Sequence, residues 1–125
     1  MTYDKNNIFA KILRGEVPCD KIYENKYSLA FKDINPQANV HILIIPKGQY
    51  IDVDDFLKNA SQDEIVSLMQ AVTEVCKITK VASSEGGNGF RLIANTGVDG
   101  SQEVPHFHFH VMGGEPMGLR GLRRS

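Results

Sequence analysis

Several residue types are scarce in this chain, and each scarcity excludes a class of protein. The only two cysteines, Cys19 and Cys76, are too few for a disulfide framework and lack the paired spacing of a zinc site. No apolar run approaches the ~20 residues of a membrane span, and the charges throughout residues 1–16 argue against a secretory signal peptide. We therefore expect a cytoplasmic protein whose thiols are reduced.

Net charge is also scarce. Lys and Arg number 14 and Asp and Glu number 15, so the formal net charge is -1, and neither nucleic acid nor an anionic membrane is an expected partner. Any anion must be bound by a local site. With 125 residues, of which 42% are hydrophobic, the chain fits one compact domain. We expect a single domain over residues 1–125, with its core at about 8–117 and a C-terminal tail at 118–125.

Two places carry the signals of a helix. Asn7 can cap a short helix with an apolar stripe, and Gly15 can end it. The second helix begins with Ser61-x-x-Glu64, which has the form of a capping box, and apolar residues at helical spacing continue to about residue 82.

Five segments have the composition of strands, at residues 21–24, 28–31, 40–45, 90–95 and 106–112. The first two flank the turn-like Asn25-Lys26 and suggest a hairpin, and the third stops at Pro46. Helices and strands are segregated along the chain, and several connections have hairpin length. This pattern predicts an α+β fold with a mainly antiparallel five-stranded sheet and two helices.

The chemistry of the chain is concentrated in three alternating histidines, His106, His108 and His110. Alternate side chains of a strand share one face, so the three imidazoles would form a row with spacings of roughly 6.5 to 7 Å, while the phenylalanines between them enter the core. A fourth histidine, His41, interrupts the apolar strand at 40–45. One histidine on a strand is often a packing residue, but three in alternation favour a role as nucleophile, base or ligand.

Two functional interpretations of this row compete. Ligands at alternate positions would span roughly 13 Å, too far to converge on an ion with ~2.1 Å bonds without a bulge, so the metal site is the weaker one. A nucleophile flanked by proton-handling groups tolerates the spacing because a substrate can lie along the row. The glycines of the preceding loop, 96–102, let backbone N–H groups approach a phosphate, with Ser101 and Gln102 as further donors. Taken alone, this loop also suits a solvated connector.

The segment from Asn95 to Gly114, with its three histidines and closing Gly-Gly, resembles the signature of the histidine triad family. Residues 33–38 and 41–47 resemble the nucleotide-binding-protein branch in particular, and the resemblance extends over about residues 8–117. It implies the fold of that family and a two-fold homodimer, for which the apolar helix after Ser61 is long enough to serve as an interface. We expect no metal and no cofactor.

The resemblance implies a hydrolase for phosphoramidates or mixed anhydrides of purine nucleoside monophosphates, such as adenosine phosphoramidate or aminoacyl adenylates. His108 aligns with the nucleophile, which forms a nucleotidyl-histidine that water cleaves to release the monophosphate, such as AMP. His106 and His41 match positions that orient groups and relay protons, and His110 matches the position near the phosphate and leaving group. The alternative is a non-catalytic regulatory module that binds adenine nucleotides without depending on His108.

The remaining positions implied by the resemblance form the nucleotide site. Asp33 matches the residue that accepts hydrogen bonds from the ribose hydroxyls, although it also suits a turn. The phosphate side comprises Asn95, Ser101, Gln102 and Glu103, the base pocket comprises Ile8, Phe9, Ile12, Phe31 and Ile34, and Phe109 is also assigned to the site. Ile8, Ile12 and Phe31 would be apolar in a core as well as in a pocket.

The sequence departs from the family pattern in two places. Glu103 stands where some members have serine, and an acid there repels a bound anion unless it points away or accepts from a backbone amide. The tail at 118–125 lacks the tryptophan found in some relatives. Its three arginines are expected to form a solvated end that could attract acidic groups of a substrate.

Overall fold

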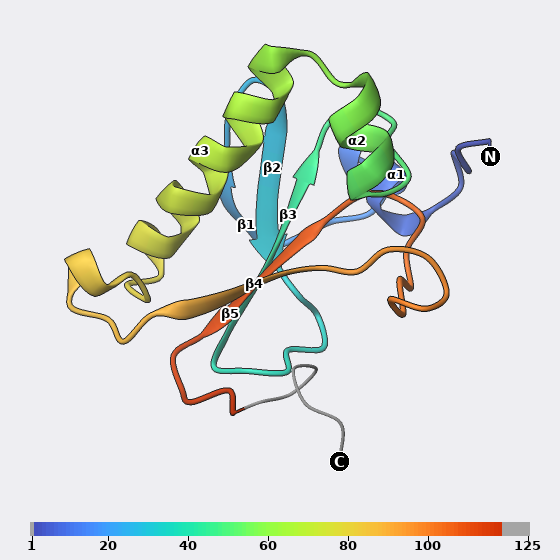
Figure 1. The fold of residues 1–125 in the computed structure, drawn as a ribbon. Coiled ribbons are helices and arrows are strands. Elements are labelled where there is room, and N and C mark those ends of the chain that lie inside the picture. Colours follow the sequence, from blue (N-terminus) through green and yellow to red (C-terminus); the bar gives the residue numbers. More distant parts are fainter. Residues whose placement is uncertain (1, 119–125) are drawn as a thin grey trace.

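A five-stranded antiparallel sheet organises the fold of residues 2–118, which are the residues described by this computed structural model (Figure 1). In chain order the elements are α1 (Ile8–Leu13), β1 (Lys21–Glu24), β2 (Ser28–Lys32), β3 (Val40–Pro46), α2 (Val53–Asn59), α3 (Gln62–Ile78), the 3₁₀ turn η1 (Ser83–Glu85), β4 (Phe90–Ala94) and β5 (Phe109–Gly113). The strand order is β1-β2-β3-β5-β4, and every neighbouring pair is antiparallel. The predicted α+β class is therefore confirmed.

Both predicted helices begin at their expected caps. The Asn7 side chain accepts a hydrogen bond from the backbone N–H of Ala10 at the start of α1, and Ser61 and Glu64 form the reciprocal bonds of a capping box at the start of α3. Helix α3 ends at Ile78, earlier than the predicted residue 82. Lys80 there has a left-handed backbone, with φ of 60°, which a continuing helix does not allow.

Helix α2 has no counterpart among the sequence-based predictions. Asp52 caps it by accepting from the N–H of Asp55, but Phe56 is its one buried residue, so the segment shows no apolar stripe. The Phe56 ring lies 5.1 Å, between centroids, from the rings of both Tyr50 and Phe107. Helix α2 thus packs against the chain that leads into β5.

The two faces of the sheet carry different cores. Under α2 and α3 the core consists of Ala30, Ile42, Ile44, Phe56, Leu68, Ala71, Val72, Val75, Cys76, Val81, Phe107 and Val111. On the opposite face, beside α1, a smaller core consists of Phe9, Leu29, Phe31, Leu43 and Ile45. Strand β3 contributes alternate residues to the two cores, and His41 belongs to the face of the smaller one, as alternation predicts.

Strand β5 begins at Phe109, so the prediction of a strand from residue 106 is wrong at its start. Before β5, the backbone N–H of Phe107 donates to the Tyr50 carbonyl at 2.7 Å, and no sheet ladder includes residues 106–108. The facing pattern nevertheless persists, because Phe107 and Val111 both enter the core under α3. The three histidines therefore still share the other face, although the first two lie outside the strand.

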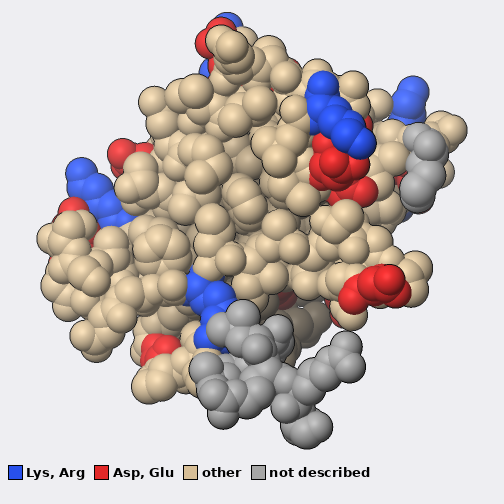
Figure 2. Space-filling view, in the orientation of Figure 1, with Lys and Arg blue, Asp and Glu red and all other residues tan. Residues whose placement is uncertain are grey.

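The charged residues on the face shown in Figure 2 are distributed as the small net charge suggests. Lys, Arg, Asp and Glu are scattered in small groups on the face shown in Figure 2, which has no extended basic area among the described residues. Within residues 2–118 no helix is both long and apolar enough to cross a membrane. Apart from Gly118, the predicted tail and its arginines lie outside the described residues.

Candidate active site

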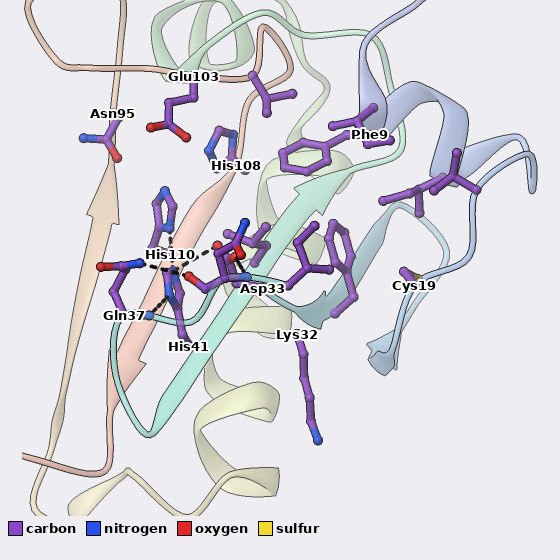
Figure 3. Close-up of a pocket in the computed structure, with 18 of the residues that line it drawn as sticks. Phe9, Cys19, Lys32, Asp33, Gln37, His41, Asn95, Glu103, His108 and His110 are labelled. Atoms are coloured by element: carbon purple, nitrogen blue, oxygen red, sulfur yellow. Dashed lines mark hydrogen bonds and ion pairs between the residues drawn. The ribbon is translucent and has the colours of Figure 1, made fainter.

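A cavity of about 590 Å³ lies on the face of the sheet that carries the smaller core (Figure 3). Its floor is a row of side chains across the sheet, because Phe31 pairs with Leu43 and Leu43 pairs with His110. The predicted site residues that line it are Ile8, Phe9, Ile12, Phe31, Asp33, Ile34, His41, Asn95, Ser101, Glu103, His108 and His110. Three others, His106, Gln102 and Phe109, are not part of the lining.

His108 presents a free ring nitrogen to this cavity. Its Nδ1 lies 2.8 Å from the backbone carbonyl oxygen of His106, which can only accept, so Nδ1 carries the proton and Nε2 keeps a lone pair. His108 is 5% exposed, and its ring contacts Phe9 edge-on, with centroids 5.0 Å apart. Burial lowers the pKa of His108, although the hydrogen bond to His106 opposes this. A neutral imidazole with a free lone pair is a competent nucleophile.

His41 and His110 form a chain of hydrogen bonds with a defined direction. The backbone N–H of Gln37 donates to Nδ1 of His41 at 3.0 Å, so the proton of neutral His41 must reside on Nε2. That Nε2 lies 2.9 Å from Nδ1 of His110, which therefore accepts. His110 must then carry its proton on Nε2, where it can be donated to a ligand.

Burial favours the neutral form of both histidines in this hydrogen-bond chain. It lowers the pKa of His110 to about 4, with further lowering by the nearby His108 and His41. Burial also lowers the pKa of His41, despite a carboxylate oxygen of Asp33 at 3.4 Å from its Nε2. The other oxygen of Asp33 accepts from the N–H of Asn35 at 2.8 Å, which fixes the carboxylate beside the cavity.

The same three side chains, Asp33, His41 and His110, bring their ligand atoms within 4.8 Å of one another, as a metal site would require. Nε2 of His41 could coordinate a metal only if its proton moved to Nδ1. That proton would meet the N–H of Gln37, and the hydrogen bond between them would be lost. The observed bonding therefore fits a proton relay better than a ligand set.

His106 is fully buried and does not line the cavity, but its backbone carbonyl holds the Nδ1 proton of His108. Its Nε2 donates to the Pro46 carbonyl at 2.9 Å, and its Nδ1 lies 2.6 Å from the hydroxyl of Tyr3. Burial lowers the pKa of His106 to about 4. Sequence reasoning missed Tyr3, because its partner is 103 positions away and no local pattern connects the two.

The loop at 96–102 does not form the predicted cradle of glycine amides. The N–H of Gly97 donates to the side-chain oxygen of Gln102 at 3.0 Å, and the N–H of Gly100 donates to the Thr96 carbonyl at 3.1 Å. A Cβ on Gly100 would lie 2.4 Å from that carbonyl oxygen, so glycine is required for this closure. The amide of Gln102 also donates to the carbonyls of Ile51 and Val104. Gln102 therefore braces the loop, and the prediction that it donates to a phosphate is wrong for this arrangement.

Ser101 and Glu103 remain at the phosphate side of the cavity. Both line it, and neither side chain makes a hydrogen bond within the described residues. Figure 3 shows the Glu103 carboxylate near Asn95 and His108. The side chain therefore does not point away from the cavity, as we expected it would if a bound phosphate were to avoid repulsion. Its negative charge raises the pKa of His108, but burial lowers that pKa more strongly.

Other residues that the sequence analysis did not single out complete the lining of the cavity. They are Val17, Pro18, Cys19, Lys32, Asn35, Gln37, Leu43 and Val104.

Comparison with known proteins gives a consistent result. Residues 14–117 match the family model of the HIT domain. An uncharacterized HIT-like protein of Azospirillum brasilense is 52% identical over 117 residues, which are 94% of this chain and 93% of the relative. The purine nucleoside phosphoramidase of Escherichia coli is 41% identical over 116 residues, which are 91% of this chain and 92% of the enzyme.

Solved structures agree with the sequence comparisons. A HIT family hydrolase from Clostridium thermocellum is 38% identical and superposes with a TM-score of 0.81, covering 92% of this chain and 96% of its own. A histidine triad protein from Clostridium difficile is 37% identical, with a TM-score of 0.78 over 93% of this chain and 96% of its own.

Proposed function

Because this chain belongs to the HIT domain family, we propose that it hydrolyses purine nucleoside 5′-phosphoramidates, or the related aminoacyl adenylates, and releases the nucleoside monophosphate. The observation that carries the proposal is the state of His108. Its Nδ1 proton is held by a backbone carbonyl, and its free Nε2 faces a cavity of the size that small ligands occupy.

The proposed reaction has two displacements at phosphorus. Nε2 of His108 attacks, the phosphorus–nitrogen bond breaks, and the departing amine takes a proton from His110, which donates as an imidazolium after binding a second proton and so returns to the neutral ring. The modified His108 ring then carries a positive charge, and its centroid lies 5.0 Å from that of His110. Water next attacks phosphorus, the bond to His108 breaks, and the proton of the water returns to His110.

The substrate class follows from the remaining walls. Apolar residues of α1 and β2, Phe9 and Phe31 among them, offer a surface for a base, and Asp33 offers an anchored carboxylate to ribose hydroxyls. The name of the Escherichia coli relative supports a purine phosphoramidate. Glu103 beside His108 disfavours a leaving group that departs as an anion, so phosphoramidates, which release an amine, are expected to be better substrates than acyl adenylates, which release a carboxylate.

We expect activity without a metal ion. The test is a panel of adenosine and guanosine phosphoramidates and acyl adenylates, assayed with and without a chelator that removes zinc and magnesium. The relay from Gln37 through His41 to His110 engages both ring nitrogens of His41 and Nδ1 of His110 in hydrogen bonds, so turnover should be unchanged by the chelator. Loss of turnover after chelation, with recovery on adding zinc, would contradict this expectation. Binding of the monophosphates without turnover of any panel member would favour the regulatory module instead.

We also expect a homodimer, and we propose that it pairs through β4. The helix after Ser61, which the sequence suggested as the interface, buries most of its apolar residues in the core of its own chain. Strand β4 is an edge of the sheet, and its Phe90 and Leu92 are 43% and 37% exposed. The opposite edge, β1, has charged ends and an irregular register, features that discourage strand pairing. Light scattering at micromolar concentration should give the mass of two chains.

The matched pair of variants for this expectation is Leu92→Asp and Leu57→Asp. Leu57 on α2 is 59% exposed and lies away from the strand edge. The first variant should be monomeric and the second dimeric. A wild-type monomer, or a dimer that persists in Leu92→Asp, would count against pairing through β4.

A further inference from the structure

The segment that carries the proposed nucleophile is held mainly by side chains. Residues 106–108 precede β5 and are outside the sheet ladder, and the N–H of Phe107 supplies one backbone bond, to the Tyr50 carbonyl. The carbonyl of His106 is what holds the Nδ1 proton of His108. The orientation and tautomer of His108 therefore depend on where the His106 peptide is fixed.

His106 itself is fixed at both ring nitrogens. The Pro46 carbonyl can only accept, so Nε2 of His106 carries the proton and donates to it at 2.9 Å. Nδ1 must then be the acceptor, and the hydroxyl of Tyr3, 2.6 Å away, must be the donor. The Tyr3 ring also packs edge-on against the imidazole, with centroids 5.6 Å apart.

Tyr3 reaches this place because the chain before α1 is folded back on itself. The side-chain amide of Asn7 donates to the Asp4 carbonyl at 2.7 Å, and the Asp4 carboxylate accepts from the N–H of Asn6 at 2.9 Å. Asn7 also caps α1, whose Phe9 ring contacts both His106 and His108. The N-terminal segment and the histidine row are thus packed as one unit.

We propose that Tyr3 is a positioning residue for His108 and acts through His106. Its hydroxyl donates a hydrogen bond to Nδ1 of the buried His106 ring, the one acceptor of that ring. With both ring nitrogens bonded, His106 is fixed in place, and its carbonyl stays within hydrogen-bond distance of Nδ1 of His108. Tyr3 does not line the cavity, so it touches neither the substrate nor the reacting atoms. The inference rests on the proposed function in one respect, namely that His108 is the attacking group.

The test removes only the hydroxyl. Tyr3→Phe keeps the ring packing and leaves Nδ1 of His106 without a donor in a site that water does not reach. We expect kcat to fall about tenfold while KM changes less than about twofold, because orientation of the nucleophile is affected and the substrate walls are not. Tyr23→Phe is the control, because Tyr23 packs against the larger core and its hydroxyl makes no hydrogen bond within the described residues.

Nitrogen NMR of histidine-labelled protein gives a readout that needs no substrate. In the wild type, His108 should show a protonated Nδ1 and an unprotonated Nε2, and His106 the reverse. In Tyr3→Phe the His106 Nδ1 signal should move to that of a free acceptor, and His108 should show a mixture of tautomers. The proposal is overturned if His108 keeps a single tautomer in Tyr3→Phe and kcat equals that of Tyr23→Phe. If no nucleotide is turned over at all, the proposed function fails, but the NMR comparison still decides the role of Tyr3.

Discussion

Replacing His108 with alanine is expected to lower kcat by about four to six orders of magnitude and to leave nucleoside monophosphate affinity within a few-fold of wild type. The loss is large because His108 supplies the lone pair that opens the covalent route, whereas the lone pairs of His41, His106 and His110 already accept hydrogen bonds. Affinity should persist because the walls formed by Phe9, Phe31 and Asp33 are unchanged. Steady-state kinetics and calorimetric titration with AMP measure the two effects separately.

A glycine variant distinguishes a role of His108 as nucleophile from a role in packing. His108→Gly removes the whole ring and leaves a space beside Phe9, into which free imidazole can diffuse. Added imidazole should then restore part of the turnover in His108→Gly. If His108→Ala retains near-normal turnover, or if imidazole rescues nothing in a variant that still binds AMP, the assignment of His108 as the nucleophile is contradicted.

Replacing His110 with alanine is expected to lower kcat/KM for alkyl phosphoramidates by about 10²- to 10⁴-fold, the range typical of a lost general acid. An amine is a poor leaving group without a proton, and the bond with His41 occupies Nδ1 of His110, so Nε2 is the nitrogen from which the protonated ring can donate. Rates for a series of phosphoramidates with amines of graded basicity measure this dependence.

The acyl adenylates provide the internal control for His110. Their leaving group is a carboxylate, which departs without protonation, so His110→Ala should slow them far less than it slows phosphoramidates. Equal losses for both substrate classes would mean that His110 positions the phosphate and does not donate the proton.

Local patterns predicted much of the fold. The capping signals at Asn7 and Ser61 are made by neighbours in the chain, and the alternation around His41 follows from strand geometry alone. Helix α2 escaped prediction because a short helix with one buried residue, Phe56, leaves no periodic signal. Strand β5 begins later than expected because apolar alternation continues through Phe107, which packs against α2 without pairing in the sheet.

The sequence predicted those site residues whose role follows from their residue type. It missed the roles that depend on hydrogen bonds between distant parts of the chain. The histidines and Asp33 were found because their chemistry is visible in the sequence. The role of Gln102 in bracing the loop depends on its hydrogen bond to the carbonyl of Ile51. The tautomer of His41 depends on the hydrogen bond from the N–H of Gln37. Neither contact has a local sequence signal. The same holds for Tyr3, which reaches the histidine row from the far end of the chain.

The central claim is that a nucleotidyl group is attached to His108 during turnover. Wild-type protein mixed with an excess of radiolabelled adenosine phosphoramidate and quenched in base should carry one acid-labile, base-stable label per active chain. Fragmentation of the labelled peptide by mass spectrometry should place that label on Nε2 of His108. A label on His106 or His110, or full turnover without any trapped label at the earliest quench times, would contradict the account.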